Sequence, residues 1–291
     1  MDKDLKEILA PLDGHLRRVD EEIQKRLRTG IPIIDASAIH LFLSGGKRIR
    51  ASLVILSSGL RGDIPEGIIE LAAATEIVHA SSLILDDLPA LDDAALRRGR
   101  PANHVAHGEA MALMAAFNLF DLAFATIARS YDAPAAQRLT ALLAGAVGSE
   151  GLIAGEVEDL QAAAGTISFE TLERIHRWKT GALFVAAAVA GAVTAGGRPD
   201  QSAALSAYAK NLGLAFQIVD DLLDVEGDPA ETGKARLADA RKTTFVSFSG
   251  VEGARQLARE LCDTAVAALA PFGARASRLR QLADFVAARR S

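Results

Sequence analysis

Two pairs of aspartates interrupt an otherwise apolar stretch at residues 76–101, EIVHASSLILDDLPALDDAALRRGRP. Asp86 and Asp87 follow a Leu-Ile-Leu run, and Asp92 and Asp93 follow a second group of apolar residues. Ionised carboxylates are strongly unfavourable to bury without partners. A divalent cation removes that penalty, and Mg²⁺ is usually held by one or two carboxylates while water or phosphate fills its other positions. The stretch therefore predicts a magnesium site, and the arginines after it predict phosphate ligands.

Pro89 lies between the two aspartate pairs. On an ideal helix, which turns about 100° per residue, Asp86 and Asp92 would point roughly 120° apart. Pro89 is expected to interrupt that helix, because proline lacks the amide hydrogen and clashes with the preceding turn. The interruption would let both carboxylates turn toward one ion.

A second acidic stretch at residues 212–228, LGLAFQIVDDLLDVEGD, repeats the pattern of an apolar helix that runs into paired carboxylates. Asp220 and Asp221 form the pair. Asp224 lies four residues after Asp220, so these two side chains share a helical face. Two such helices could face each other across one cavity.

Basic residues precede both acidic stretches. The motif GGKRIR at residues 45–50 places Lys47 and Arg50 on one face at the start of a predicted helix, where free N–H groups and the helix dipole attract an anion. A solvated charge cluster at a turn explains the pair equally well. His79 lies two turns before Asp86 on nearly the same helical stripe, which directs its ring either toward the same cavity or, as a satisfied side chain, into the core.

Two further polar groups follow later in the chain. Residues 168–195 predict one continuous helix, in which Lys179 and Thr180 precede a long apolar run. A cation at that place is unusual for a core helix. The polar connection after the second acidic stretch carries Lys234 and Lys242 among glycine and short polar residues. We interpret this connection as a lid over a charged ligand, with a solvated loop as the alternative.

Helical spacing of apolar residues dominates the chain, and no convincing strand alternation appears. We therefore expect an all-α fold, with residues 1–291 forming a single domain of helices around a central cavity. The two acidic clusters and the basic residues would line this cavity, and the apolar helix turns below them would form an apolar pocket. A ligand with a diphosphate head and a hydrocarbon tail fits both parts. Metal-assisted departure of the diphosphate would leave an allylic cation, which a dry pocket shields from water.

Composition restricts the possible partners and the location. The chain has 291 residues, 50% of them hydrophobic, with a formal net charge of −5 and a pI near 5.7. This balance argues against binding to nucleic acid or to an anionic membrane surface. The N-terminus is too charged for a secretory signal and one cysteine permits no internal disulfide, so we expect a cytoplasmic protein. The uncharged run at residues 180–197 is rich in Ala and Gly, and we expect a buried helix there and no transmembrane segment.

Four of these motifs occur together in an order that is highly specific. They are GGKRIR, DDLPALDD followed by LRRGRP, WKTGALF, and FQIVDDLLD followed by a Gly-Lys loop. In this combination, and in length, the chain resembles the trans-isoprenyl diphosphate synthases of the polyprenyl synthase family, of the bacterial farnesyl and geranylgeranyl type. The resemblance implies a Mg²⁺-dependent prenyltransferase. Such an enzyme condenses isopentenyl diphosphate with the allylic dimethylallyl, geranyl or farnesyl diphosphate head-to-tail and releases diphosphate.

The resemblance also implies a role for each motif residue. The implied catalytic residues are the aspartate pairs and one cation, namely Asp86, Asp87, Asp92, Lys179, Asp220 and Asp221. The implied Mg²⁺ ligands are Asp86, Asp92, Asp220 and Asp224. Isopentenyl diphosphate would be held by Lys47, Arg50, His79 and Arg98. The allylic diphosphate would be held by Arg97, Lys179, Thr180, Gln217, Lys234 and Lys242.

Product length is expected to depend on the residues one helical turn before the first acidic pair. They are Ser81 and Ser82, whereas relatives that stop at fifteen carbons often have an aromatic residue at one of these positions. Small side chains leave room for a further five-carbon unit, so geranylgeranyl diphosphate is the expected product. Farnesyl diphosphate is the alternative if bulky side chains of a neighbouring helix block the tunnel, namely Met114, Phe117 and Phe120.

A homodimer is expected partly from the resemblance and partly because the helix at residues 110–128 is apolar nearly all round. Two other functions stay open. A terpene cyclase of the same fold would share the first acidic motif, but it typically has a mixed Asn/Ser/Glu second motif and has no need of Lys47 and Arg50. An inactive helical scaffold is the other alternative, and the retention of every charged ligand argues against it.

Overall fold

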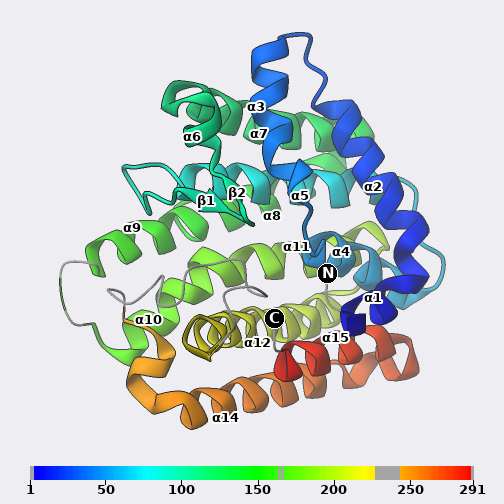
Figure 1. Ribbon diagram of the computed structural model, residues 1–291. Helices are drawn as coiled ribbons and strands as arrows, with labels where there is room; N and C mark the ends of the chain where they lie inside the picture. The colour runs from blue at the N-terminus through cyan, green and yellow to red at the C-terminus, as the bar shows by residue number, and fades with distance from the viewer. Residues whose placement is uncertain (1–2, 163–164, 166, 227–242, 290–291) are drawn as a thin grey trace.

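The computed structural model describes residues 3–162, 165, 167–226 and 243–289, and these fold almost entirely into helices (Figure 1). The α-helices are α1 (Lys3–Leu9), α2 (Asp13–Arg26), α3 (Pro32–Leu43), α4 (Ile49–Ser58), α5 (Ile68–Asp86), α6 (Asn103–His107), α7 (Glu109–Ser130), α8 (Ala133–Val147), α9 (Leu152–Ala162), α10 (Phe169–His176), α11 (Ala182–Thr194), α12 (Pro199–Glu226), α14 (Phe245–Ala268) and α15 (Ser277–Ala288). Shorter helical turns are η1 (Ala10–Leu12), η2 (Gly59–Arg61), η3 (Arg177–Gly181) and η4 (Ala270–Ala276). The predicted all-α fold is confirmed.

A two-stranded hairpin is the exception to the helical pattern in the described residues. Strands β1 (Leu96–Arg97) and β2 (Arg100–Pro101) pair antiparallel, with Arg97 opposite Arg100. The two residues between them, Arg98 and Gly99, have φ angles of 54° and 75°. Positive φ at both central residues is the signature of the tight turn whose twist matches that of paired strands. The hairpin was not predicted from the sequence, and it directs the arginines that follow the first acidic motif.

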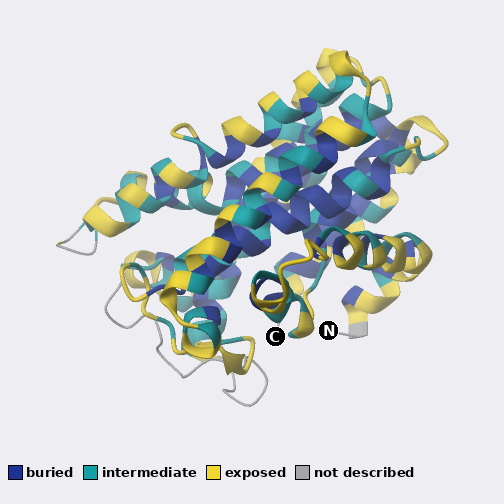
Figure 2. Ribbon diagram, turned by 90° about the horizontal axis from the view of Figure 1, so that it is seen from above, coloured by how far each residue is buried: buried dark blue, intermediate teal, exposed yellow. Residues whose placement is uncertain are grey.

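Helix α5 is the central element, because it packs against α2, α4, α7 and α11. Its alanines and β-branched residues are buried almost without exception, which lets neighbouring helices approach closely. Helices α11 and α12 pack against each other below it, and α14 packs along α12. Figure 2 shows the buried segments concentrated in these middle helices and the exposed segments along the outer ones.

A glycine allows the closest of these approaches. Gly191 of α11 faces α4, and a β-carbon at this position would lie 2.2 Å from the carbonyl oxygen of Val54. Only glycine therefore permits the two helices to pack at this separation. Packing of α11 on α4, α8 and α12 buries most of α11, which forms the greater part of the uncharged run at residues 180–197, as expected from its composition.

One hydrophobic cluster draws buried residues from α1 at one end of the chain to α15 at the other, from Leu5 to Val286. A smaller cluster lies between α10, α12 and α14, with Phe245 and Ile218 fully buried in it. Helix α12 contributes to both clusters. We infer that residues 1–291 form a single domain.

Among the described residues, two helices are long and apolar enough to cross a membrane by length and composition, namely α5 and α7. The apolar window of α5 is 72% buried inside the fold, as in a core helix. That of α7 is only 39% buried, because several of its large apolar side chains face outward. The exposed apolar side of α7 is the kind of surface that often forms an interface.

Candidate active site

The first acidic motif lies where α5 ends. The helix stops at Asp86 with Asp87 as its C-cap, so the predicted interruption near Pro89 is confirmed. The chain then turns back, and the amide of Asp92 donates to the carbonyl oxygen of Asp86 at 3.0 Å. This turn brings Asp92 next to the helix end that carries the first pair. The backbone, and not the helical repeat, places the two carboxylates in one region.

The aspartate that follows Asp86 has an internal partner. Asp87 is 1% exposed and accepts from Nε of Arg97 at 2.9 and 3.2 Å. Burial raises the pKa of Asp87, and the hydrogen bonds of Arg97 oppose this shift. The charges of Asp86 and Asp92 raise the pKa of Asp87 further, which shows that the three carboxylates are electrostatic neighbours. Arg97 thus holds Asp87 in this structure.

The segment η3 places a lysine beside the first motif. The expected helix over residues 168–195 is continuous in its path, but residues Arg177–Gly181 wind as a π-helix. π-Helical turns are rare and often occur at functional sites. Within the turn, Nζ of Lys179 lies 3.3 Å from Oδ1 of Asp86. The wider winding therefore carries Lys179 to the end of α5.

Two further carboxylates contact the same ammonium group. Oε2 of Glu156 lies 2.7 Å from Nζ of Lys179, and Oδ2 of Asp159 lies 2.9 Å from it. Burial alone would lower the pKa of Lys179, but the three surrounding carboxylates outweigh it and raise this pKa above its ordinary value. Burial raises the pKa of Glu156 to about 7, with the charge of Asp86 adding to the shift and Lys179 opposing it.

Sequence reasoning missed Glu156 and Asp159. Both belong to α9, at positions three residues apart, and they share one face of that helix. The available signal was a cluster of three acidic residues, Glu156, Glu158 and Asp159, in a helix that starts with apolar residues.

A group of basic side chains lies around His79 of α5. Arg50 stacks over the ring of Phe184 at 4.8 Å, and its Nε is buried with no hydrogen-bond partner among the described residues. Burial lowers the pKa of Arg50 to about 10. Arg98 donates to the carbonyl oxygen of Gly45 in the turn that also carries Lys47. A buried, unpaired guanidinium N–H is suited to an anionic ligand that the protein does not itself supply.

His79 belongs to this basic group. Burial lowers its pKa well below the ordinary value, and the positive charges of Arg50, Arg98, Arg97 and Arg48 lower it further. The structure therefore brings together Arg50, His79 and Arg98, three of the four residues that the resemblance implied as ligands of isopentenyl diphosphate. Arg48 was not predicted.

Arg48 and Glu76 make contacts that hold the start of α4, the helix that carries Arg50. Arg48 pairs with Asp20 at 2.8 Å and approaches Glu76 to 3.8 Å. Glu76 is 5% exposed and accepts from the amide of Ala51 at 2.9 Å, near the start of α4. A buried carboxylate on α5 thus fixes the helix start that presents Arg50.

The second acidic motif lies on α12. Asp220 pairs with Arg289 at 2.7 Å, and the guanidinium group of Arg289 also lies 4.8 Å from the centre of the Phe216 ring. Asp221 is 6% exposed and accepts from the amide of Phe245 at 3.0 Å. The carboxylate of Asp221 therefore supports the start of α14. Asp224 lies one turn further along α12 and is half-buried.

Consecutive residues of η3 connect the two acidic motifs. Lys179 contacts Asp86 of the first motif. The hydroxyl of Thr180 donates to Oε1 of Gln217 at 3.2 Å, and Nε2 of Gln217 donates to Asp221 of the second motif at 3.3 Å. The two motifs thus lie on either side of one helical turn. The predicted ligands Lys234 and Lys242 lie outside the described residues.

The donor set fits a cation that is shared with a ligand. In the described part of the chain, no group of three or more His, Cys, Asp or Glu side chains is spaced to hold a metal ion by itself. Magnesium usually takes only one or two carboxylates and fills its other positions with water and phosphate oxygens. Asp86 and Asp92 at one motif and Asp220 and Asp224 at the other are compatible with that kind of site.

The predicted chain-length residues do not all face one space. Ser81 is fully buried, and its hydroxyl donates to the carbonyl oxygen of Ala116 on α7 at 2.8 Å. Ser82 is half-buried and lies four residues before Asp86, on the same helical face. Phe117 and Met114 are 64% and 46% exposed on the outside of α7. Within one chain, Phe117 therefore does not close an internal tunnel.

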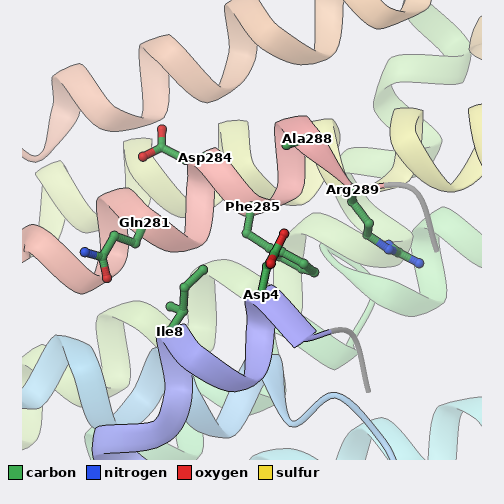
Figure 3. Close-up of a pocket in the computed structure, with 7 residues that line it drawn as sticks. All are labelled: Asp4, Ile8, Gln281, Asp284, Phe285, Ala288 and Arg289. Atoms are coloured by element: carbon green, nitrogen blue, oxygen red, sulfur yellow. The ribbon is translucent and has the colours of Figure 1, made fainter.

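A surface pocket of about 690 Å³ lies between the two ends of the chain (Figure 3). It is lined by side chains of α1 and α15 and by Arg289. Among the predicted site residues, none lines this pocket. Arg289 connects the pocket to the second motif through its ion pair with Asp220.

Comparison with known proteins agrees with this geometry. The family model described as polyprenyl synthetase matches residues 31–267. The chain is 38% identical over 291 residues to geranylgeranyl pyrophosphate synthase 11, chloroplastic, of Arabidopsis thaliana, covering 95% of this chain and 82% of that protein. It is 41% identical over 265 residues to farnesyl diphosphate synthase of Escherichia coli K12, covering 88% of each.

A solved structure supports the same conclusion. The polyprenyl synthase from Caulobacter crescentus CB15, crystallised with calcium and isoprenyl diphosphate, superimposes with a TM-score of 0.88 at 30% identity. The superposition covers 99% of this chain and 98% of that one. With the two acidic motifs, the basic group and the fold in agreement, the chain belongs to the polyprenyl synthetase family.

Proposed function

We propose that this protein is a Mg²⁺-dependent trans-prenyltransferase that condenses isopentenyl diphosphate with an allylic diphosphate head-to-tail and releases diphosphate. The observation that carries the proposal is the position of Lys179 and Thr180. Lys179 contacts Asp86 of the first motif, and Thr180 is linked to Asp221 of the second motif through Gln217. This arrangement provides one place for a diphosphate between two sets of carboxylates. Membership of the polyprenyl synthetase family supports the reaction type.

The two diphosphates would occupy different groups of side chains. The allylic diphosphate would lie at the acidic motifs with Lys179, Thr180, Gln217 and Arg97, and with Lys234 and Lys242 from outside the described residues. Isopentenyl diphosphate would lie at Lys47, Arg50, His79 and Arg98. Arg50 supports this assignment because its buried Nε has no protein partner in the described part of the chain.

The metal ion would be held by Asp86, Asp92, Asp220 and Asp224. When bound, Mg²⁺ would neutralise negative charge on the departing diphosphate. The protein itself would bind and orient both substrates, and its apolar helix faces would keep water from the allylic carbon. Calcium accompanies isoprenyl diphosphate in the Caulobacter crescentus relative, which supports a divalent ion in this role.

Geranylgeranyl diphosphate is the product we favour, and farnesyl diphosphate is the alternative. Relatives named for each product are similar to this chain at 38% and 41% identity, so names alone do not separate them. The small side chain of Ser82 supports the longer product, since it shares the face of α5 that carries Asp86. A bulky residue at Ser82 would shorten the space available to a growing chain.

The function can be tested by product extraction. The protein is incubated with isopentenyl diphosphate and labelled dimethylallyl, geranyl or farnesyl diphosphate, with Mg²⁺ or with EDTA. We expect a twenty-carbon diphosphate only when Mg²⁺ is present. A fifteen-carbon product supports the alternative, cyclic hydrocarbons indicate a terpene cyclase, and no turnover of any substrate contradicts the proposal.

The Ser82→Phe variant tests product length in the same assay. We expect it to shift the main product from twenty to fifteen carbons, because the ring occupies space one turn before Asp86. Ser81→Ala is the matched control, since Ser81 faces α7 and its hydroxyl is bonded there. An unchanged product distribution in Ser82→Phe would place the limit on chain length elsewhere.

We also propose that the protein is a cytoplasmic homodimer. Leu113, Met114 and Phe117 of α7 are exposed in the single chain, and they form one apolar side of that helix. Exposed apolar groups of this size usually mark an interface. A second copy that covers α7 would remove them from water.

A further inference from the structure

The ammonium group of Lys179 has more carboxylate partners than the proposed reaction requires. Asp86 of α5 belongs to the first acidic motif, but Glu156 and Asp159 come from α9, outside every motif used so far. All three carboxylates lie within 3.3 Å of Nζ. The side chains of Lys179 and Glu156 are 17% and 14% exposed, so water screens their contact only weakly.

Helix α9 packs closely against the π-helical turn that carries Lys179. A β-carbon on Gly155 would lie 2.3 Å from the backbone nitrogen of Lys179 and 2.8 Å from its Cα. Only glycine permits this approach, and the residue directly after it is Glu156. The backbone contact therefore fixes the distance from which α9 presents its two carboxylates.

The number of donors on the lysine matches the number of acceptors. A lysine ammonium has three N–H donors and no acceptor. Glu156 and Asp159 can accept two of these hydrogen bonds, and the carboxylate of Asp86 lies 3.3 Å away as an ion-pair partner for the third. Asp86 is also a proposed metal ligand, and a metal ion bound there would compete with the ammonium group for the same carboxylate.

We propose that Glu156 and Asp159 are positioning residues that hold two donors of Lys179, so that its third donor is directed at the allylic diphosphate when Asp86 binds metal. This inference rests on the proposed function. Without the α9 carboxylates, the flexible lysine side chain would be repelled from the metal site and would lose its fixed direction. The two residues act through Lys179, and they need no contact with substrate.

Steady-state kinetics provides the first test. We expect Glu156→Ala and Asp159→Ala each to lower kcat/KM for the allylic diphosphate by about 10-fold or more, the effect of losing a hydrogen bond to a charged group. KM for isopentenyl diphosphate should change by less than about two-fold, because its proposed group lies elsewhere. Glu156→Gln and Asp159→Asn keep an acceptor oxygen and should recover most of the loss.

Glu158→Ala is the matched control on the same helix. Glu158 pairs with Arg174 of α10 at 2.9 Å, so its carboxylate is directed at a different cation from Lys179. The variant should leave both kinetic parameters unchanged. Equal losses for both substrates in the Glu156 and Asp159 variants, with no recovery in the amide variants, would show a merely structural role and overturn the proposal.

A double-variant comparison tests whether the α9 carboxylates act through the lysine. In a Lys179→Met background, Glu156→Ala should cause no further loss of allylic kcat/KM. If the two losses multiply, Glu156 acts independently of Lys179 and the proposal is wrong.

A binding measurement separates this inference from the proposed reaction. Affinity for inorganic diphosphate in the presence of Mg²⁺ can be measured by calorimetry without turnover. We expect Glu156→Ala and Asp159→Ala to weaken it about 10-fold, and Glu158→Ala to leave it unchanged. This result would support the positioning role even if no prenyl product formed, whereas unchanged diphosphate affinity in both Ala variants would overturn it even in an active prenyltransferase.

Discussion

At the scale of single residues, the acidic motifs are held by cations that compensate their charge. Lys179 contacts three carboxylates, Arg97 holds Asp87, and Arg289 pairs with Asp220. A buried carboxylate without a partner would be strongly unfavourable, so these cations stabilise the acidic motifs. Around His79, by contrast, several arginines converge on one imidazole ring and lower its pKa.

Asp92 and Asp93 allow a matched test of the first acidic motif. We expect Asp92→Asn to lower kcat/KM by about 100-fold or more, because it removes a proposed metal ligand that would act as charge develops on the leaving group. Asp93 has a φ angle of 48°, a conformation that asparagine also adopts readily. Asp93→Asn removes the same charge one residue away and should retain activity. Equal activity in the two variants would exclude Asp92 as a ligand.

His79 should make the protein less stable in mild acid. Its folded-state pKa lies well below the ordinary value of 6.5, so below pH 6.5 the unfolded chain binds a proton that the folded chain does not. The free energy of unfolding should therefore fall as pH falls through 6.5. Denaturant unfolding should show a smaller loss between pH 7.5 and 5.5 in His79→Gln. Parallel losses in both proteins would contradict the prediction.

At the scale of elements, three local features position the charged residues. Helix α5 ends at Asp86, the π-helical turn η3 widens the helix at Lys179, and the β1–β2 hairpin returns Arg97 to Asp87. Glycines at two helix contacts set the distance between the neighbouring helical segments. Gly155 brings α9 to η3, and Gly191 brings α11 to α4.

Two glycine substitutions should have opposite effects on stability. Gly191→Ala would place a β-carbon 2.2 Å from the carbonyl oxygen of Val54, so it should lower the melting temperature. Gly145 is exposed within α8, and a β-carbon there would meet no atom within 4 Å, so Gly145→Ala should stabilise the protein by about 0.5–1 kcal/mol. Thermal unfolding of both variants tests the helix separation. A neutral Gly191→Ala variant would mean that α11 can move away from α4.

At the scale of the whole molecule, helices α1 and α15 at the two ends of the described chain lie close together (Figure 1), and large apolar side chains of α7 are exposed. Helices α1 and α15 pack against each other, and the hydroxyl of Tyr208 on α12 donates to the carbonyl oxygen of Leu279 on α15 at 2.7 Å. The C-terminal helix is therefore fixed to the helix that carries the second acidic motif. Helix α7 lies on the opposite side from α14.

The predicted dimer can be tested by placing a charge on α7. Phe117 is 64% exposed, so Phe117→Asp should cost a folded monomer little but should disrupt an interface that buries this position. Light scattering at micromolar concentration should show a dimer for the unchanged protein and a monomer for the variant. Phe248→Asp is the control, because Phe248 is 42% exposed on α14, away from α7. A monomeric unchanged protein would contradict the dimer.

Most helices and the motif residues could be predicted from the sequence, because both depend on local information. Apolar spacing specifies a helical face within a few turns. Pro89 ends α5 wherever that helix packs, and the duplicated acidic motifs identify Asp86, Asp92, Asp220 and Asp224 without knowledge of the fold. The family resemblance implied a group of Lys47, Arg50, His79 and Arg98, of which the structure brings Arg50, His79 and Arg98 together.

Only the tertiary structure decided which side chains meet across helices. Glu156 and Asp159 contact Lys179 because Gly155 lets α9 approach η3, and no spacing along the chain encodes that approach. The hydrogen bond of Asp221 to the start of α14 likewise depends on how α12 and α14 pack. The outward position of Phe117 likewise depends on which helices cover α7. Sequence periodicity states which face of a helix is apolar or charged. It does not state which other helix will cover that face, because that depends on the packing of all the helices together.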